Sequence, residues 1–153
     1  MTAPGPRPLF TVTAIAEVIT WAMLITAMIL RAADVTDALV RPAGGIHGFV
    51  FLCYVVVVIA VWIDGRWSIG RGLLALASAI VPFMTVPFER AMARRGVPEP
   101  QWRVLRDDAD RPLDRLLASV LTRPVISAVI AIAAVSIVFA LLLAAGPPTQ
   151  WFS

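Results

Sequence analysis

The ionisable side chain that stands deepest in an apolar segment is that of Glu17. It lies eight residues into the apolar stretch 9–30, so a helix rising about 1.5 Å per residue places it roughly 12 Å from the start of that stretch. Ionising a carboxyl group at that depth in lipid is costly, so Glu17 is predicted to face other helices or to be protonated. It could handle protons or cations, or it could join two helices by a hydrogen bond to a threonine or serine. We favour the second interpretation, because the sequence contains no second deep carboxylate for a relay.

His47 is the only histidine and stands near the start of the second apolar stretch. It is predicted to lie about one turn inside the second helix, near the cytoplasmic interface. A single histidine excludes haem ligation by two histidines of one chain, and it leaves a single axial ligand or a site shared between subunits open. A hydrogen-bonded interfacial histidine is the favoured interpretation. Beside it, Gly44 and Gly48 form a small-xxx-small step that allows another helix to approach closely.

Glu89 and Arg90 form a further polar group, at the end of the third apolar stretch. The second helix is expected to start on the side of the membrane where the third one ends. His47, Glu89 and Arg90 are therefore predicted to lie at one depth and to form a polar cluster. Glu17 is predicted nearer the opposite face, so we expect no contact between Glu17 and His47.

The composition defines the environment that these side chains share. The chain has 153 residues, of which 59% are hydrophobic and 15% charged, and its mean hydropathy is +0.85. Soluble domains have about 45–50% apolar and about 25% charged residues. The composition therefore excludes a soluble globular domain, a disordered chain, a collagen-like repeat and a disulfide scaffold, and it indicates an integral membrane protein. The single cysteine, Cys53, cannot form a disulfide within the chain.

Four apolar stretches are long enough to cross a membrane as helices. Each has about 17–22 residues, close to the number that spans about 30 Å of hydrocarbon, and helices satisfy their own backbone groups in lipid. The predicted fold is all-α, with four transmembrane helices. Pro82 and Pro87 are predicted to kink the third helix where it packs on its neighbours. The stretches are 9–30, a second one that starts near Pro42 or Ile46 and ends at residue 63, 72–88 and 125–145.

An amphipathic helix is predicted between the third and fourth apolar stretches. Apolar residues recur there at helical spacing on one face, and a short helix with arginines beside a membrane span is predicted to lie in the interface. Packing on the cytoplasmic ends of the bundle is the alternative. The apolar face comprises Leu113, Leu116, Leu117, Val120 and Leu121. The predicted organisation is an irregular tail (1–8), a three-helix membrane module (9–95), a cytoplasmic loop with the amphipathic helix (96–123), and a fourth helix with a short tail (124–153).

All 13 basic residues are arginines, the net charge is +3, and the pI is near 10.4. In a membrane protein, arginines in loops set the topology and contact anionic headgroups, so no nucleic acid is expected as a partner. Arg7, Arg66 and Arg71 are predicted on one side and the other ten arginines on the opposite side. This bias predicts both termini outside and the 89–123 loop in the cytoplasm.

Several short motifs, taken in order, resemble a known family. They are Ala16-Glu17, Gly44 with His47-Gly48, Trp67-Ser68, Pro82-Phe83 and Phe88-Glu89-Arg90. With them the chain resembles the YdzA-like small bacterial integral membrane proteins, a domain-of-unknown-function family with a His-Gly dipeptide, over roughly residues 9–95. The resemblance implies a three-helix membrane module and no particular activity. Residues 96–153 extend that module and could dock a partner.

No Walker-type glycine loop, nucleophile elbow, zinc-ligand spacing or paired carboxylates occur in the sequence. We therefore expect neither an enzyme nor a bound metal or cofactor. The predicted function is a non-enzymatic accessory, assembly or stabilising subunit of a larger bacterial membrane complex, with a respiratory complex as one candidate host. The expected location is the inner membrane, and the expected partners are the lipid bilayer and other membrane subunits or further copies of the chain. The alternative is a small oligomeric proton or solute transporter that uses Glu17, and a lipid-acting membrane enzyme with His47 as its base is less favoured.

Overall fold

The computed structural model describes residues 4–107 and 109–145. The predicted C-terminal tail beyond residue 145 and the first three residues of the predicted N-terminal tail lie outside the described residues. The described part of the chain is all-helical and contains no strand, as predicted. The helices are α1 (Pro6–Ala32), α2 (Val40–Asp64), α3 (Ile69–Ile80), α4 (Thr85–Ala93), α5 (Arg103–Arg106), α6 (Pro112–Leu121) and α7 (Pro124–Ala145).

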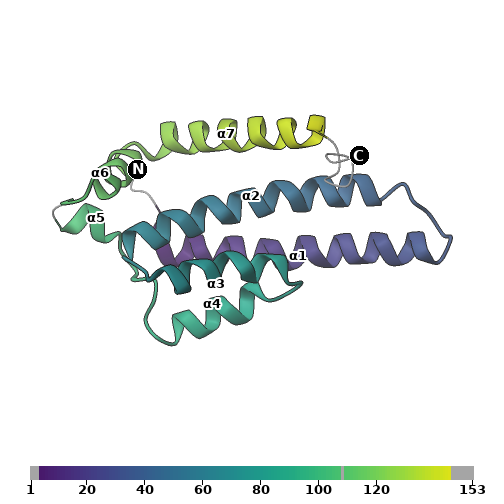
Figure 1. Cartoon of the computed structure of the whole chain (residues 1–153), viewed down its shortest axis with the longest axis horizontal. Helices are drawn as coiled ribbons and strands as arrows, with labels where there is room; N and C mark the ends of the chain where they lie inside the picture. The colour runs from purple at the N-terminus through teal and green to yellow at the C-terminus, as the bar shows by residue number, and fades with distance from the viewer. Residues whose placement is uncertain (1–3, 108, 146–153) are drawn as a thin grey trace.

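Helices α1 and α2 form a long antiparallel pair at the centre of the molecule (Figure 1). Proline occupies the first turn of α1, where the missing amide hydrogen leaves no partner unsatisfied. The core of the pair is aromatic, because the rings of Phe10 and Tyr54 stack with centroids 6.0 Å apart and Trp67 meets Phe10 edge-on at 6.0 Å. Val58 and Ala14 fill the space beside these rings and are fully buried.

The third apolar stretch does not form one kinked transmembrane helix. The prediction that it does is wrong. Helix α3 ends at Ile80 because Val81 precedes a proline, and such a residue disfavours helical torsions; its ψ of 121° is extended. Phe83 then adopts a left-handed φ of 64°, and α4 turns back beside α3 (Figure 1). The 12 residues of α3 reach about 18 Å, well short of the ~30 Å of hydrocarbon.

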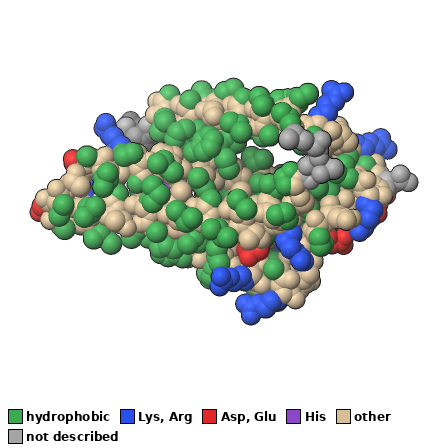
Figure 2. Space-filling model, turned by 180° about the vertical axis from the view of Figure 1, so that it is seen from behind, with side chains coloured by type: hydrophobic (Ala, Val, Ile, Leu, Met, Phe, Trp, Pro, Cys, Tyr) green, Lys and Arg blue, Asp and Glu red, His purple; other side chains and the backbone are tan. Residues whose placement is uncertain are grey.

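Three helices are long and apolar enough to cross a membrane: α1, α2 and α7. The predicted count of four spans is therefore not supported in the described part of the chain. Helix α7 runs alongside α2 on the side away from α3 and α4 (Figure 1). Val135 is its only residue classed as buried among those described, so most of α7 faces outward. Figure 2 shows hydrophobic side chains covering the long helices.

The helical hairpin of α3 and α4 changes the predicted topology. It returns the chain to the end where α1 begins, so the 89–123 segment lies with the N-terminal residues: Arg7 Nε donates to the carbonyl of Pro98 (3.1 Å) and Trp102 Nε1 to that of Pro4 (2.8 Å). The prediction that Arg7 and this segment lie on opposite sides is wrong. The two ends of the described chain lie at opposite ends of the bundle (Figure 1).

The segment predicted to form an amphipathic helix contains the helix α6, over Pro112–Leu121; its amphipathic character stays a prediction. Its Leu117 is buried in the core of the molecule, whereas Leu116 on the same face is 61% exposed. A location in the membrane interface stays a prediction.

Candidate functional site

The two ionisable residues of the apolar segments lie next to each other. Glu17 of α1 is fully buried, and its Oε2 lies 3.5 Å from Nδ1 of His47 on α2. The expectation that these residues do not meet is wrong. It assumed that the two helices begin and end at matching depths, whereas α1 runs past the start of α2 before the chain turns (Figure 1). Glu17 thereby comes level with His47.

Two further side chains of α1 complete this polar pair. Thr20 Oγ1 lies 3.1 Å from His47 Nδ1 and 3.1 Å from the carbonyl oxygen of Glu17. The ring of Trp21 lies 4.4 Å from the imidazole, and its Nε1 donates to the carbonyl of Ala79 at the end of α3 (3.1 Å). Because residues three and four apart share a helix face, α1 presents all three side chains to α2 and α3. We refer to Glu17, Thr20, Trp21 and His47 as the intramembrane polar site.

Hydrogen bonding is incomplete at Glu17. Neither carboxyl oxygen has a hydrogen-bond partner within the described residues. Thr20 has a single hydroxyl hydrogen, and when it donates to the carbonyl of Glu17, His47 Nδ1 must carry the hydrogen directed at Thr20 and Glu17. With its hydrogen on Nδ1, the His47 ring presents an N–H toward the buried Glu17 carboxyl group, 3.5 Å away, and it is the charge partner of that group when the ring is protonated.

Glu89 and Arg90 do not join His47, so the predicted cluster is wrong. Glu89 accepts a hydrogen bond from Thr11 Oγ1 (2.6 Å) near the start of α1, and Arg90 is exposed. Thr11 and Thr20 are nine residues apart on one helix, which separates Glu89 from the intramembrane polar site by about 13 Å along the axis. The early return of α4 keeps Glu89 at the end of the bundle.

The residues predicted to govern helix packing fall into two groups. Pro82 lies in the break between α3 and α4, and Pro87 lies exposed in the first turn of α4, where proline is tolerated, so neither kinks a packed span. Gly48 does allow close approach, because a β-carbon there would lie 3.3 Å from the ring of Phe139 on α7. Gly44 faces Leu24 of α1 instead, at 3.9 Å.

Substitution of Gly48 by leucine is expected to displace α7 from α2. The added side chain would need the space of the Phe139 ring, and such overpacking typically costs about 1–3 kcal/mol. A bifunctional maleimide that joins Cys53 to an Ala131→Cys variant reports the approach of the two helices, because both positions line the space between them. The yield of this crosslink between α2 and α7 should fall in Gly48→Leu. It should persist in the control Gly70→Leu, where nothing lies within 4 Å; equal yields would show that Phe139 does not locate α7.

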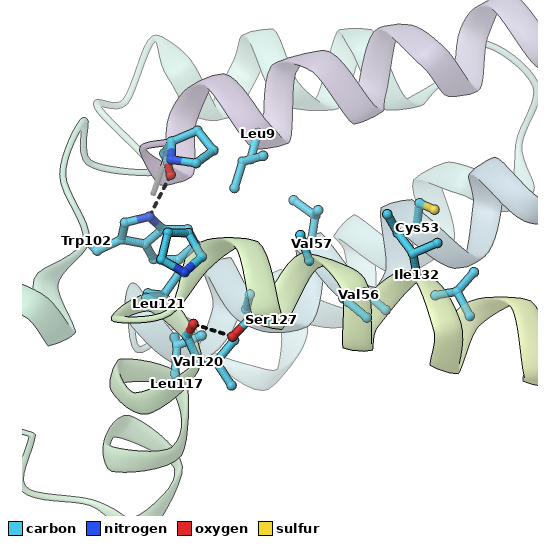
Figure 3. Close-up of a pocket in the computed structure, with 16 residues that line it drawn as sticks. Leu9, Cys53, Val56, Val57, Trp102, Leu117, Val120, Leu121, Ser127 and Ile132 are labelled. Carbon is cyan, nitrogen blue, oxygen red and sulfur yellow. Dashed lines mark hydrogen bonds between the residues drawn. The ribbon is translucent and has the colours of Figure 1, made fainter. Parts of the chain in front are cut away.

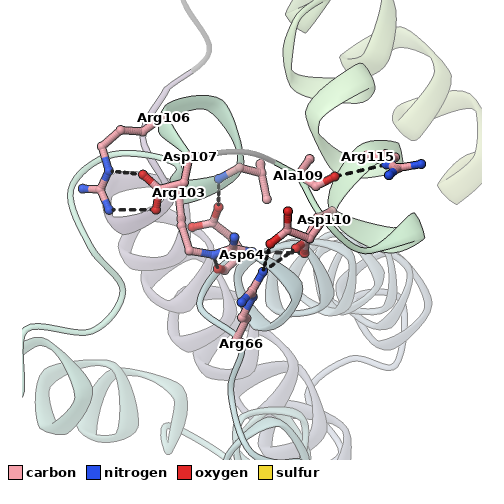
Figure 4. A network of polar contacts seen from close by, with 10 residues as sticks. Asp64, Arg66, Arg103, Arg106, Asp107, Ala109, Asp110 and Arg115 are labelled. Atoms are coloured by element: carbon pink, nitrogen blue, oxygen red, sulfur yellow. Dashed lines mark hydrogen bonds and ion pairs between the residues drawn. The ribbon is translucent and has the colours of Figure 1, made fainter.

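A second polar cluster joins the turn after α2 to α5 and α6 (Figure 4). It was not predicted from the sequence. Asp114 accepts hydrogen bonds from Nη2 of Arg66 (3.1 Å) and from Nη2 of Arg103 (3.0 Å). Arg103 Nε also donates to the carbonyl of Asp64 (2.6 Å), and the amide of Val104 donates to the Asp64 carboxylate (3.0 Å). Both aspartates are 2% exposed. The sequence does contain one signal for this cluster, because an aspartate, Asp64, directly follows the second apolar stretch.

Charge balance determines the ionisation of this second cluster, which we call the corner network (Asp64, Arg66, Arg103 and Asp114). Burial by itself would raise the pKa of the Asp114 carboxyl group. The hydrogen bonds and positive charges of Arg66 and Arg103 outweigh burial, so this pKa lies below its ordinary value of 3.8. Asp114 is therefore ionised at neutral pH and fixes α6 to the end of the bundle.

Three long apolar helices, a largely buried polar pair between two of them and most of the arginines toward one end (Figure 2) define an integral membrane protein. The chain belongs to the family described as a domain of unknown function, DUF3817, which it matches over residues 8–94. This range nearly coincides with residues 9–95, over which the family resemblance was expected, and it contains the intramembrane polar site. The more specific YdzA-like resemblance is not confirmed.

A relative in Streptomyces coelicolor, named as a membrane protein (SCO5905), is 40% identical over 94 residues. These residues make up 60% of the present chain and only 11% of the Streptomyces protein. The shared part is therefore a small portion of a much longer chain. No solved structure matches the protein.

Proposed function

We propose that this protein is a non-enzymatic accessory or stabilising subunit of a larger bacterial membrane complex. The observation that carries the proposal is the 11% share of the Streptomyces protein that the common segment occupies. A segment similar to part of this chain occurs there within a much longer chain. Such linkage keeps the segment at a high effective concentration beside other parts of the protein, and we infer that the present chain likewise has a surface for association with other membrane segments.

Helix α7 supplies that surface in our proposal. It follows the family module, and its outward residues Ile137 and Leu141 are 60% and 64% exposed. Lipid chains cover apolar residues as readily as protein does, so association within the membrane depends on close helix packing. A long apolar helix with one buried residue among those described is suited to contact a neighbouring span.

The arginine distribution supports an orientation. All 13 arginines except Arg31 and Arg41 belong to the end of the molecule that carries α5 and α6, or to the turns beside it. By the positive-inside rule, we propose that this end faces the cytoplasm of a bacterial inner membrane. The N-terminus is then cytoplasmic, and α7 crosses to the other side. In this arrangement α6 lies at the cytoplasmic interface.

Co-purification from native membranes tests the subunit proposal. A tagged chain solubilised in a mild detergent is expected to bring down a membrane protein in constant stoichiometry, and the tagged partner should recover the chain in return. Ile137→Gln should reduce the yield, since it places an unsatisfied amide in the helix contact. Arg94→Gln, on the distant α4 end, serves as the control.

Migration as a single chain or only as a self-oligomer would contradict the subunit proposal. Proton or solute flux in reconstituted vesicles that disappears with Glu17→Gln would point instead to a transporter.

A further inference from the structure

An apolar groove of about 350 Å³ separates α2 from α7 (Figure 3). Trp102 and Pro4 lie at the end of the groove nearest α5 and α6. Its volume lies in the range of small-molecule sites, which begins near 300 Å³. The walls comprise Cys53, Val57 and Ala60 of α2 and Ala128, Ala131 and Val135 of α7.

The dimensions of the groove match one leaflet of a bilayer. Its wall on α7 extends from Pro124 to Val135, which is roughly 16 Å of helix and about half of the ~30 Å hydrocarbon thickness. The groove therefore has the length and the apolar lining that suit a single hydrocarbon chain of a lipid.

The polar atoms in the wall are already satisfied. Ser127 Oγ donates to the carbonyl of Val120 (2.5 Å), and Trp102 Nε1 donates to that of Pro4 (2.8 Å). A ligand with polar groups along its length would lose its hydrogen bonds with water and gain none here. The bound part must therefore be apolar.

A positive charge lies next to one end of the groove. Arg123 is exposed and directly precedes Pro124 of the wall. Within the described residues, its guanidinium forms no ion pair with a carboxylate, whereas Arg66 and Arg103 at the same end both do. Guanidinium groups bind phosphate oxygens in a bidentate, charge-assisted manner.

We propose that the groove binds one acyl chain of an anionic phospholipid from the leaflet at the arginine-rich end, and that Arg123 holds its phosphate. The lipid fills the space between α2 and α7 and fastens α7 to the family module. This inference is independent of the proposed subunit function, because it concerns only the chain and its bilayer.

Native mass spectrometry and photo-crosslinking of the full chain test the proposal. Protein in mild detergent is offered phosphatidylglycerol or phosphatidylcholine with identical acyl chains. We expect one phosphatidylglycerol to be retained in preference, and Ala131→Phe, which fills the groove, to reduce this adduct about tenfold or more. The control Ala133→Phe adds the same ring at an exposed position of α7 that is not part of the wall. It should leave the adduct unchanged.

If Ala131→Phe does not fold, a second variant and a crosslinking experiment test lipid binding in its place. Arg123→Gln should remove most of the preference for phosphatidylglycerol and leave apolar binding in place. A phospholipid with a diazirine in one acyl chain should crosslink to the α2 and α7 peptides of the groove. Equal retention of the two lipids, an adduct unaffected by Ala131→Phe, or crosslinks spread evenly over the outer faces of α1 and α7 would each overturn it.

Discussion

Replacement of His47 by alanine is expected to destabilise the protein strongly. The Glu17 carboxyl group is fully buried, and His47 Nδ1, at 3.5 Å, belongs to its charge partner. Removing one member of a buried pair leaves the other without compensation, which typically costs about 3–5 kcal/mol. Uptake of a proton by Glu17 would reduce this cost, but the neutral acid would still have no hydrogen-bond partner among the described residues. Thermal or SDS-induced unfolding in detergent micelles measures the loss.

The double variant Glu17→Leu/His47→Leu separates pairing from packing. Buried pairs are often replaced by apolar residues at little cost, because the desolvation penalty disappears with the charges. We expect the double variant to recover most of the stability that His47→Ala loses. The pairing would be refuted if the stability losses of Glu17→Leu and His47→Leu simply added up in the double variant. An unfolding midpoint that does not change in His47→Ala would also refute it. In the first case the two residues would contribute by packing alone.

Replacement of Asp114 by alanine is expected to release α6 from the bundle. The substitution removes the acceptor of two guanidinium groups, from Arg66 and Arg103. Hydrogen bonds to charged groups contribute about 1.5–3 kcal/mol each. The hydrogen bond from Arg66 contributes less stabilising free energy than the one from Arg103, because the Arg66 side chain is 40% exposed and screened by water. Hydrogen–deuterium exchange should show faster exchange in α5 and α6 and little change in the α1–α2 pair. Asp107→Ala, at an exposed residue that pairs with Arg106, is the control.

The ionisation of the Asp114 carboxyl group determines how the stability of the α6 contact should depend on pH. The folded-state pKa of Asp114 lies below its ordinary value of 3.8. Its contribution is therefore fully present above that ordinary value and is lost as the pH falls through the lower, folded-state pKa. We expect α6 to loosen only in this acidic window in the wild-type chain. Asp114→Asn should lack this acid transition; retention of the transition in that variant would assign it to another carboxylate.

The class of protein and the long helices could be predicted from the sequence, because both depend on local properties. Apolar runs of sufficient length must form helices in lipid wherever they pack, so the positions of α1, α2 and α7 were expected. The helical spacing of apolar residues predicted a helix at the position of α6. The break at Val81 and Pro82 was also a local signal, since a residue before proline disfavours the helix. Local reasoning predicts a kink there, because the apolar run of 17 residues from Gly72 to Phe88 has the minimum length that crosses a membrane as one helix.

The candidate site depended on relations that no local pattern contains. The turn back at Phe83 placed the 89–123 segment beside Arg7 and reversed the predicted sidedness of that segment. The register of α1 against α2 brought Glu17 to His47, and register depends on how the aromatic core around Phe10 and Tyr54 packs.

The sequence by itself determined a membrane protein with arginines concentrated outside its apolar helices, because burial in lipid depends on composition and length. Only the tertiary structure decided which ends and which polar side chains meet. Helix register and the direction of a turn are set by contacts between residues that are distant in the chain.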